Sequence, residues 1–95
     1  MILVGLDRVD DFLRKHGDSR RWFENWIADV RELAWKTPTD LKARYPRASI
    51  LPKSKGVIFD VKGNDYRMHV KVNYATGVVL VVRVGTHREY DGWTY

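Results

Sequence analysis

The chain contains no cysteine, only three prolines and no long run of hydrophobic residues. The lack of cysteine excludes a disulfide framework and any thiolate metal site. The apolar stretch at the start, Met1–Val4, is too short for a signal peptide or a membrane span. The three histidines are far apart in the sequence and no HExxH-type motif occurs, which argues against a metal centre. We therefore expect a cytoplasmic protein with no metal, no cofactor and no contact with a membrane.

Positive charge is concentrated in one part of the chain. The net charge is +5, and residues 36–56 contain six lysines and arginines but only one aspartate. Such a segment is a candidate surface for an anionic partner, and a solvated loop that aids solubility is an equally good interpretation. A length of 95 residues predicts one domain, residues 1–95, with a modest core.

The first half of the chain shows helical periodicity. Apolar residues recur at helical spacing in Leu6–Leu13, and Gly17 ends this predicted helix. A second apolar stripe runs through Trp22–Ala34, and Pro38 prevents its continuation. The segment Thr39–Tyr45 predicts a short helical turn that begins with its own capping residues.

The remaining pattern is that of β-strands. Ile2–Val4 is a short β-prone run, and three longer strands are predicted at Val57–Lys62, Tyr66–Tyr74 and Val78–Gly85. Short turns join the last three, which favours antiparallel hairpins. Val78–Val82 is apolar without alternation, which is typical of a central strand. The predicted fold class is α+β: a short N-terminal strand, and two helices packed on one face of a small antiparallel sheet with a C-terminal three-stranded meander.

The strand Tyr66–Tyr74 has one apolar face and one basic face. Successive side chains point to opposite faces of a sheet, so Arg67, His69 and Lys71 lie on the same side. Cationic and imidazole groups spaced two residues apart on a rigid sheet suit a phosphate backbone. Solvated residues on an open sheet face are the alternative interpretation.

The next strand and the segment after it add further candidates. By the same alternation, Val79, Val81 and Arg83 are expected to share one face. Pairing of the two strands would then bring Arg83 beside a basic residue of its neighbour. His87 follows the end of this strand, and Tyr90 lies one helical turn further on.

These side chains match what RNA cleavage without a metal requires. The reaction needs a base for the 2′-hydroxyl, cations for the phosphorane, an acid for the leaving 5′-oxygen and in-line positioning. Arginine can donate two hydrogen bonds at once to phosphate oxygens, and a lysine near other cations can act as a base or bind the phosphate. Histidine titrates near neutrality, and tyrosine can stack on a nucleobase. The candidate catalytic residues are Arg67, Lys71, Arg83, His87 and Tyr90.

Three segments of the chain carry a distinctive combination of motifs: Val57–Tyr74, with a K-G-N-x-Y-R turn and strand, Val82–Asp91, with a terminal T-H-x-E-Y-D, and Trp35–Ile50. Together they resemble the HigB-type toxins of bacterial toxin–antitoxin modules. The resemblance implies a RelE-like fold and a ribosome-dependent mRNA endonuclease that halts translation by metal-independent attack of the 2′-hydroxyl. It also implies a helix-turn-helix antitoxin of the HigA type, with operator DNA bound only through the toxin–antitoxin complex.

The positions that match the family are Lys62, Asn64, Arg67, Lys71, Arg83, His87 and Tyr90, and we divide the candidate residues between catalysis and RNA binding. We expect the basic segment Lys36–Lys55 to dock on 16S ribosomal RNA near the A site, while the sheet face with His87 cuts mRNA. A non-nucleolytic toxin of the same fold that inhibits a protein such as gyrase, and a plain RNA-binding module, are the alternatives. The candidate RNA-binding residues are Lys36, Lys42, Arg44, Arg47, Lys53, Lys55, Lys62, Asn64 and His69.

Overall fold

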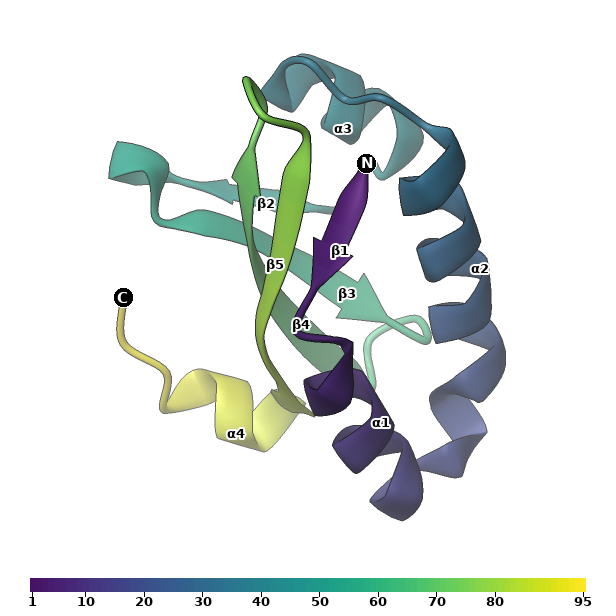
Figure 1. Cartoon of the computed structure of the whole chain (residues 1–95). Helices are drawn as coiled ribbons and strands as arrows, with labels where there is room; N and C mark the ends of the chain where they lie inside the picture. Colours follow the sequence, from purple (N-terminus) through teal and green to yellow (C-terminus); the bar gives the residue numbers. More distant parts are fainter.

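The computed structural model describes the whole chain, residues 1–95, as a five-stranded sheet with helices packed against it (Figure 1). The strand order is β1-β5-β4-β3-β2, in which β1 runs parallel to β5 and all other neighbours are antiparallel. Along the chain the elements are β1 (Ile2–Val4), α1 (Leu6–Lys15), the 3-10 helix η1 (Gly17–Ser19), α2 (Arg20–Glu32), α3 (Pro38–Arg44), β2 (Ser49–Leu51), the 3-10 helix η2 (Pro52–Ser54), β3 (Gly56–Val61), β4 (Tyr66–Asn73), β5 (Val78–Thr86) and α4 (His87–Asp91).

The core lies between the first two α-helices and one face of the sheet. Phe23, Trp26 and Val30 recur at helical spacing on α2 and are fully buried, as the apolar stripe predicts. The Trp26 ring meets Phe59 of β3 edge-on, with 5.6 Å between ring centroids. Large aromatic side chains of this kind dominate the energetics of a small core. The predicted α+β class, with two helices on one face of the sheet, is confirmed (Figure 1).

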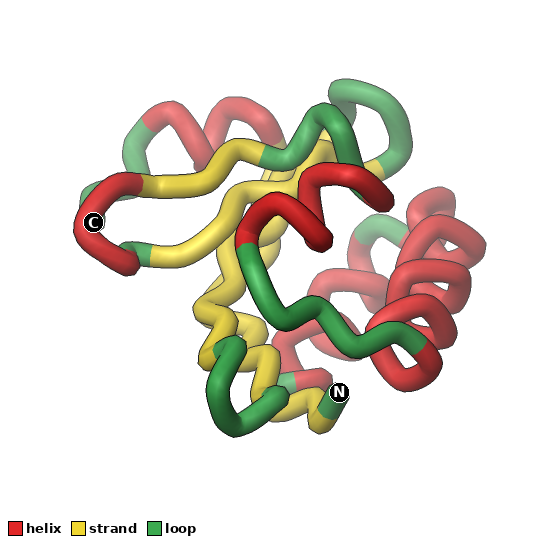
Figure 2. Tube along the Cα trace, turned by 90° about the horizontal axis from the view of Figure 1, so that it is seen from above, coloured by secondary structure: helices red, strands yellow, loops and turns green.

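The opposite face of the sheet carries α4 and the C-terminal residues (Figure 1). Viewed from above, the C-terminal end lies beside η2, the turn that joins β2 to β3 (Figure 2). A hydrogen bond of 2.7 Å from Lys55 Nζ to the backbone oxygen of Tyr95 holds the two together. The basic face of β4 and β5 is therefore flanked by η2 and α4.

Two helix boundaries differ from the predicted ones. α2 ends at Glu32, slightly before the end of the apolar stripe, because Leu33 is already extended (φ −89°, ψ 153°). α3 begins earlier than predicted, since its cap is Thr37, whose hydroxyl accepts a hydrogen bond from the Asp40 N–H while the Asp40 carboxylate bonds back. Pro38 thus opens this helix, at a position where an N–H would have no partner inside the helix.

Two features of the sheet were not predicted. β2 is a fifth strand, and its exposed residues Ser49 and Ile50 give no alternation by which it could be detected. β1 pairs with β5 in parallel, with Ile2 opposite Val78, so the sheet is mixed rather than wholly antiparallel. The predicted central strand, β5, does lie inside the sheet, between β1 and β4.

A β-bulge interrupts the pairing of β4 with β5. His69 is opposite Arg83 and Val70 is opposite Val81, which leaves Val82 without a partner on β4. Val81 is fully buried on the helix side of the sheet, whereas Arg83 is placed on the other side. The prediction that Arg83 shares a face with Val81 is therefore wrong, because one extra residue inverts the alternation.

Candidate functional site

Arg67 is the most tightly held of the candidate catalytic side chains. It lies on β4 with only 7% of its surface exposed. Its guanidinium donates to the backbone oxygens of Asn64 (3.2 Å) and Tyr66 (3.0 Å) and to the Asn64 side chain, and its Nε lies 3.2 Å from a carboxylate oxygen of Asp60. A guanidinium has five N–H donors, and these contacts use four of them. Arg67 is thus fixed in one orientation and keeps a donor for a ligand.

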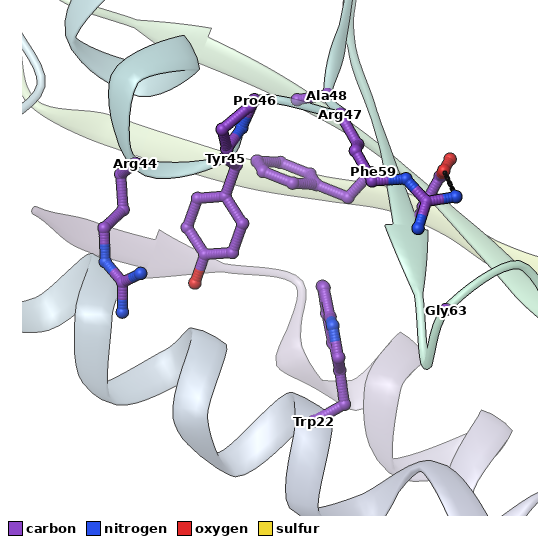
Figure 3. A pocket seen from close by; sticks show the side chains of 9 residues that line it. Trp22, Arg44, Tyr45, Pro46, Arg47, Ala48, Phe59 and Gly63 are labelled. Carbon is purple, nitrogen blue, oxygen red and sulfur yellow. Dashed lines mark ion pairs between the residues drawn. The ribbon is translucent and has the colours of Figure 1, made fainter.

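Asp60 of β3 joins two arginines. One carboxylate oxygen contacts Arg67, and the other lies 3.1 Å from Nη2 of Arg47, an ion pair that is drawn as a dashed line in Figure 3. Sequence reasoning missed this role. The available signal was a lone carboxylate in an otherwise apolar strand, at the position directly opposite Arg67 in the β3–β4 pairing.

A capping box fixes the start of α4. The Thr86 hydroxyl accepts a hydrogen bond from the Glu89 N–H at 3.2 Å, and the Glu89 carboxylate accepts one from the Thr86 N–H at 3.0 Å. The hydrogen bond from the Thr86 backbone lowers the pKa of Glu89, so the cap stays ionised at neutral pH. The His87 N–H donates to the Asp65 backbone oxygen at 3.3 Å, which ties α4 to the turn between β3 and β4.

This short helix brings two further candidates to Arg67. The Tyr90 ring lies over the guanidinium, with 5.4 Å from Arg67 Cζ to the ring centroid. The His87 side chain is 46% exposed, and its ring centroid is 5.9 Å from that of Tyr90. Its Nδ1 is 3.7 Å from the carboxylate of Asp91. Arg67, His87 and Tyr90 therefore form one group, called here the Arg67 cluster.

The other basic candidate residues of the sheet lie together at a second site, separate from the Arg67 cluster. They line a hollow of about 350 Å³ into which no carboxylate side chain projects. We call it the cationic hollow, and it is lined by Lys55, His69, Lys71, Val82, Arg83, Thr94 and Tyr95. Lys71 and Arg83 were predicted to act in catalysis together with Arg67, but in the structure they line this separate hollow.

Aromatic rings of the C-terminal residues connect the Arg67 cluster with the cationic hollow. The Arg83 guanidinium lies 4.7 Å from the Trp93 ring centroid and 5.3 Å from that of Tyr95, and its Nη2 donates to the Thr94 backbone oxygen at 2.8 Å. Trp93 in turn meets Tyr90 edge-on, with 5.6 Å between centroids. The C-terminal residues therefore pack on the basic face itself, which the sequence pattern did not reveal.

His69 is more deeply buried than a residue of an open basic face would be. It is 3% exposed, its ring is edge-on to that of Tyr95, and its Nε2 bonds to the Lys55 backbone oxygen at 2.8 Å. Since a carbonyl oxygen can only accept, the proton is on Nε2. Burial and the nearby charges of Arg83 and Lys71 lower the pKa of His69, so the ring is neutral at pH 7.

The basic connecting segment packs against α2 through paired charges. Arg44 Nη2 lies 2.7 Å from the carboxylate of Asp29 on α2, which also accepts a hydrogen bond of 2.6 Å from the Tyr45 hydroxyl. Burial and this hydrogen bond raise the pKa of Tyr45. A pocket of about 250 Å³ opens here, with Tyr45 on one side and Trp22 of α2 on the other (Figure 3). Part of the segment's positive charge is thus neutralised within the fold.

The remaining RNA-binding candidates are distributed over several surfaces. Asn64 contacts Arg67, and Lys62 pairs with Asp18 of η1 at 2.8 Å. Arg47 pairs with Asp60, as described above. The cations of the connecting segment that are exposed and have no ion pair are Lys36, Lys42, Lys53 and Lys55.

Neither a metal-binding cluster nor a membrane-spanning helix is present. No three histidine or carboxylate side chains lie close enough together to hold a metal ion. None of the helices combines the length and the apolar character that crossing a bilayer requires.

The mixed five-stranded sheet with helices packed on one face is consistent with a small RelE-like toxin fold, and a family model described as the RelE-like toxic component of a toxin–antitoxin system matches residues 19–93. Because the match covers most of the chain, the protein belongs to the HigB toxin family. It is the toxin of a toxin–antitoxin system, and the family implies a cognate antitoxin as its partner. A search of curated proteins found no match.

Proposed function

We propose that this toxin is an endonuclease that cuts mRNA on the ribosome and thereby inhibits translation. The observation that carries the proposal is the Arg67 cluster, in which a fixed guanidinium, an exposed imidazole and a phenol meet on one face of the sheet. Family membership supports the toxic role, and the net charge of +5 suits an RNA target.

The chemistry requires neither a metal nor a cofactor. The 2′-oxygen attacks the adjacent phosphorus, the O2′–P bond forms and the P–O5′ bond breaks, which leaves a 2′,3′-cyclic phosphate and a 5′-hydroxyl end. The proton leaves the 2′-hydroxyl and one is delivered to the 5′-oxygen, so no other reactant is consumed. Arg67 stabilises the charge of the phosphorane, and His87 moves one of the two protons. Tyr90 stacks on a nucleobase and holds the strand in line.

Docking on the ribosome is assigned to the basic connecting segment. Its unpaired lysines are exposed and can reach an RNA surface, and we propose 16S ribosomal RNA near the A site as that surface. The antitoxin is proposed to be a helix-turn-helix protein of the HigA type, through which the complex binds operator DNA. The unpaired lysines of this segment are Lys36, Lys42, Lys53 and Lys55, and the first three do not line the cationic hollow.

Mapping of RNA 5′ ends after induction in bacteria tests the proposal. The wild type should produce new 5′-hydroxyl ends in translated transcripts, and His87→Ala should reduce them by about 10²–10⁴-fold. Arg88→Ala is the matched control, because Arg88 is an exposed residue of the same helix without an ion pair, and it should cut normally.

Growth arrest with intact transcripts would contradict the proposal, and accompanying DNA damage would instead indicate a target such as gyrase. Binding of RNA without toxicity would indicate a plain RNA-binding module. Full cleavage by His87→Ala would remove His87 from the mechanism.

A further inference from the structure

Two side chains that line the cationic hollow, His69 and Arg83, each have a buried nitrogen atom without a partner. His69 Nδ1 and Arg83 Nε are buried and make no hydrogen bond. Buried polar atoms nearly always have a hydrogen-bond partner in proteins, so two unpaired nitrogen atoms at one hollow indicate a place where a partner binds. We infer that the hollow binds one ribonucleotide of single-stranded RNA, its phosphate held by Lys55, Lys71 and Arg83, beside the nucleotide that the Arg67 cluster cuts. The inference rests on the proposed function, since it assigns a second binding position to the same RNA strand.

The hollow retains enough donors for a phosphate. Arg83 uses Nη2 for the Thr94 oxygen, and Lys55 uses one of its three N–H groups for the Tyr95 oxygen. Lys71 is exposed and makes no hydrogen bond within the protein. Hydrogen bonds from cations to phosphate oxygens are about twice as strong as those between neutral groups. A phosphate can therefore share the donors of Arg83 and Lys55 with the two backbone oxygens.

His69 supplies the group that selects ribose. Its Nε2 proton is used by the Lys55 backbone oxygen, so Nδ1 of the neutral ring is an acceptor. An anionic phosphate oxygen cannot donate to it, but a 2′-hydroxyl can. DNA lacks this hydroxyl, which is the group by which proteins distinguish RNA from DNA at a given position.

The hollow is placed to receive a neighbouring nucleotide. Its volume of about 350 Å³ lies in the usual range for small-ligand sites. Tyr90 of the Arg67 cluster contacts Trp93, and Trp93 covers Arg83 of the hollow. Aromatic faces of this kind stack on nucleobases with little sequence preference. A strand cut at the Arg67 cluster can therefore continue across Trp93 into the hollow.

Binding of a labelled five-nucleotide RNA, followed by fluorescence anisotropy without ribosomes, tests the phosphate contacts. Lys71→Gln and Arg83→Gln should each weaken binding about tenfold and reduce the slope of log K against log salt by about 0.7. Arg31→Gln removes the same charge from an exposed position on α2 and should change neither. Equal effects of Lys71→Gln and Arg31→Gln would overturn the inference.

The same RNA and its all-deoxy counterpart test the role of His69. The wild type should bind the RNA more tightly, and His69→Gln, which keeps a donor for the Lys55 oxygen, should remove most of that preference. An undiminished preference in His69→Gln would overturn the ribose contact. If the wild type binds RNA in this way but produces no new 5′ ends in cells, the proposed endonuclease function is contradicted while the inference about the hollow stands.

Discussion

His69 and Arg83 stand directly opposite one another on β4 and β5, because Val82 is an extra residue that β4 does not match. Regular alternation would have turned the Arg83 side chain into the core beside Val81. Bulges commonly re-aim a side chain near a functional site. Here the bulge places Arg83 in the cationic hollow, beside the two other cations that line it, Lys55 and Lys71.

Gly85 is predicted to tolerate no side chain. It lies opposite Arg67 on β5, and a Cβ there would be 2.9 Å from Trp93 and 3.2 Å from Glu89. Gly85→Ala should displace Trp93 and α4 and lower the free energy of unfolding by about 1–3 kcal/mol, measured by urea titration with tryptophan fluorescence. Gly17→Ala is the control, since its Cβ would meet nothing within 4 Å. Similar losses in the two variants would show that the close packing around Gly85 is not the cause.

Removal of the Asp60 charge is predicted to destabilise the protein through Arg67. Asp60→Asn leaves the buried guanidinium of Arg67 without its carboxylate, and we expect the free energy of unfolding to fall by about 1–3 kcal/mol. Arg47→Gln breaks the other ion pair of the same carboxylate, but Arg47 is largely exposed, so the loss should stay below about 1 kcal/mol. Chemical denaturation of both variants checks this order, and a larger effect of Arg47→Gln would contradict it.

The capping box of α4 is predicted to affect RNA cleavage because it fixes the helix that positions His87 and Tyr90. Thr86→Ala removes the hydroxyl that accepts from the Glu89 N–H, at a cost of about 1 kcal/mol, and should loosen the helix that carries His87 and Tyr90. We expect RNA cleavage to fall while the global unfolding transition moves little. Thr86→Ser keeps the hydroxyl and should restore cleavage. Failure of serine to restore it would show that the threonine acts by other means.

Acid sensitivity is predicted to arise partly from Asp18. Hydrogen bonds from Lys62 (2.8 Å) and from the Tyr66 hydroxyl (2.9 Å) hold the pKa of Asp18 below its ordinary value of 3.8. Because this pKa is lower in the folded than in the unfolded protein, the contribution is fully present above about pH 4 and is lost as the pH falls through the folded value. Asp18→Asn should therefore lower the melting temperature at pH 7 and flatten its decline below about pH 4. Asp10→Asn, at an exposed position without an ion pair, should leave the decline unchanged.

Local sequence signals were sufficient for most of the elements. The turns that contain Gly63 and Gly77 join strands of clear alternation or continuous hydrophobicity, so the meander of β3, β4 and β5 is found almost at its predicted bounds. The parallel pairing of Ile2 with Val78 could not be predicted, because it joins segments from the two ends of the chain. The unmatched Val82 was missed as well, since a bulge depends on which strand lies alongside.

For the candidate site, the sequence could predict only which side chains share a face within a single strand. Alternation places Arg67, His69 and Lys71 on one face of β4, and the structure shows that arrangement. Alternation carries no information about burial by distant residues. The packing of Tyr95 against His69 and the pairing of Asp60 with Arg67 both come from other segments, and Arg67 and His69 are left only 7% and 3% exposed.

The parallel pairing of β1 with β5 has a consequence for synthesis of the toxin. β1 is synthesised well before its only hydrogen-bonded neighbour in the sheet, β5, because the rest of the sheet lies between them in the sequence. Closing such a long loop makes folding late and slow, since non-local pairs form only after the intervening chain is ordered. A nascent or prematurely terminated chain that ends before Val78 therefore lacks a complete sheet, and the folded toxin forms only after β5 has been synthesised.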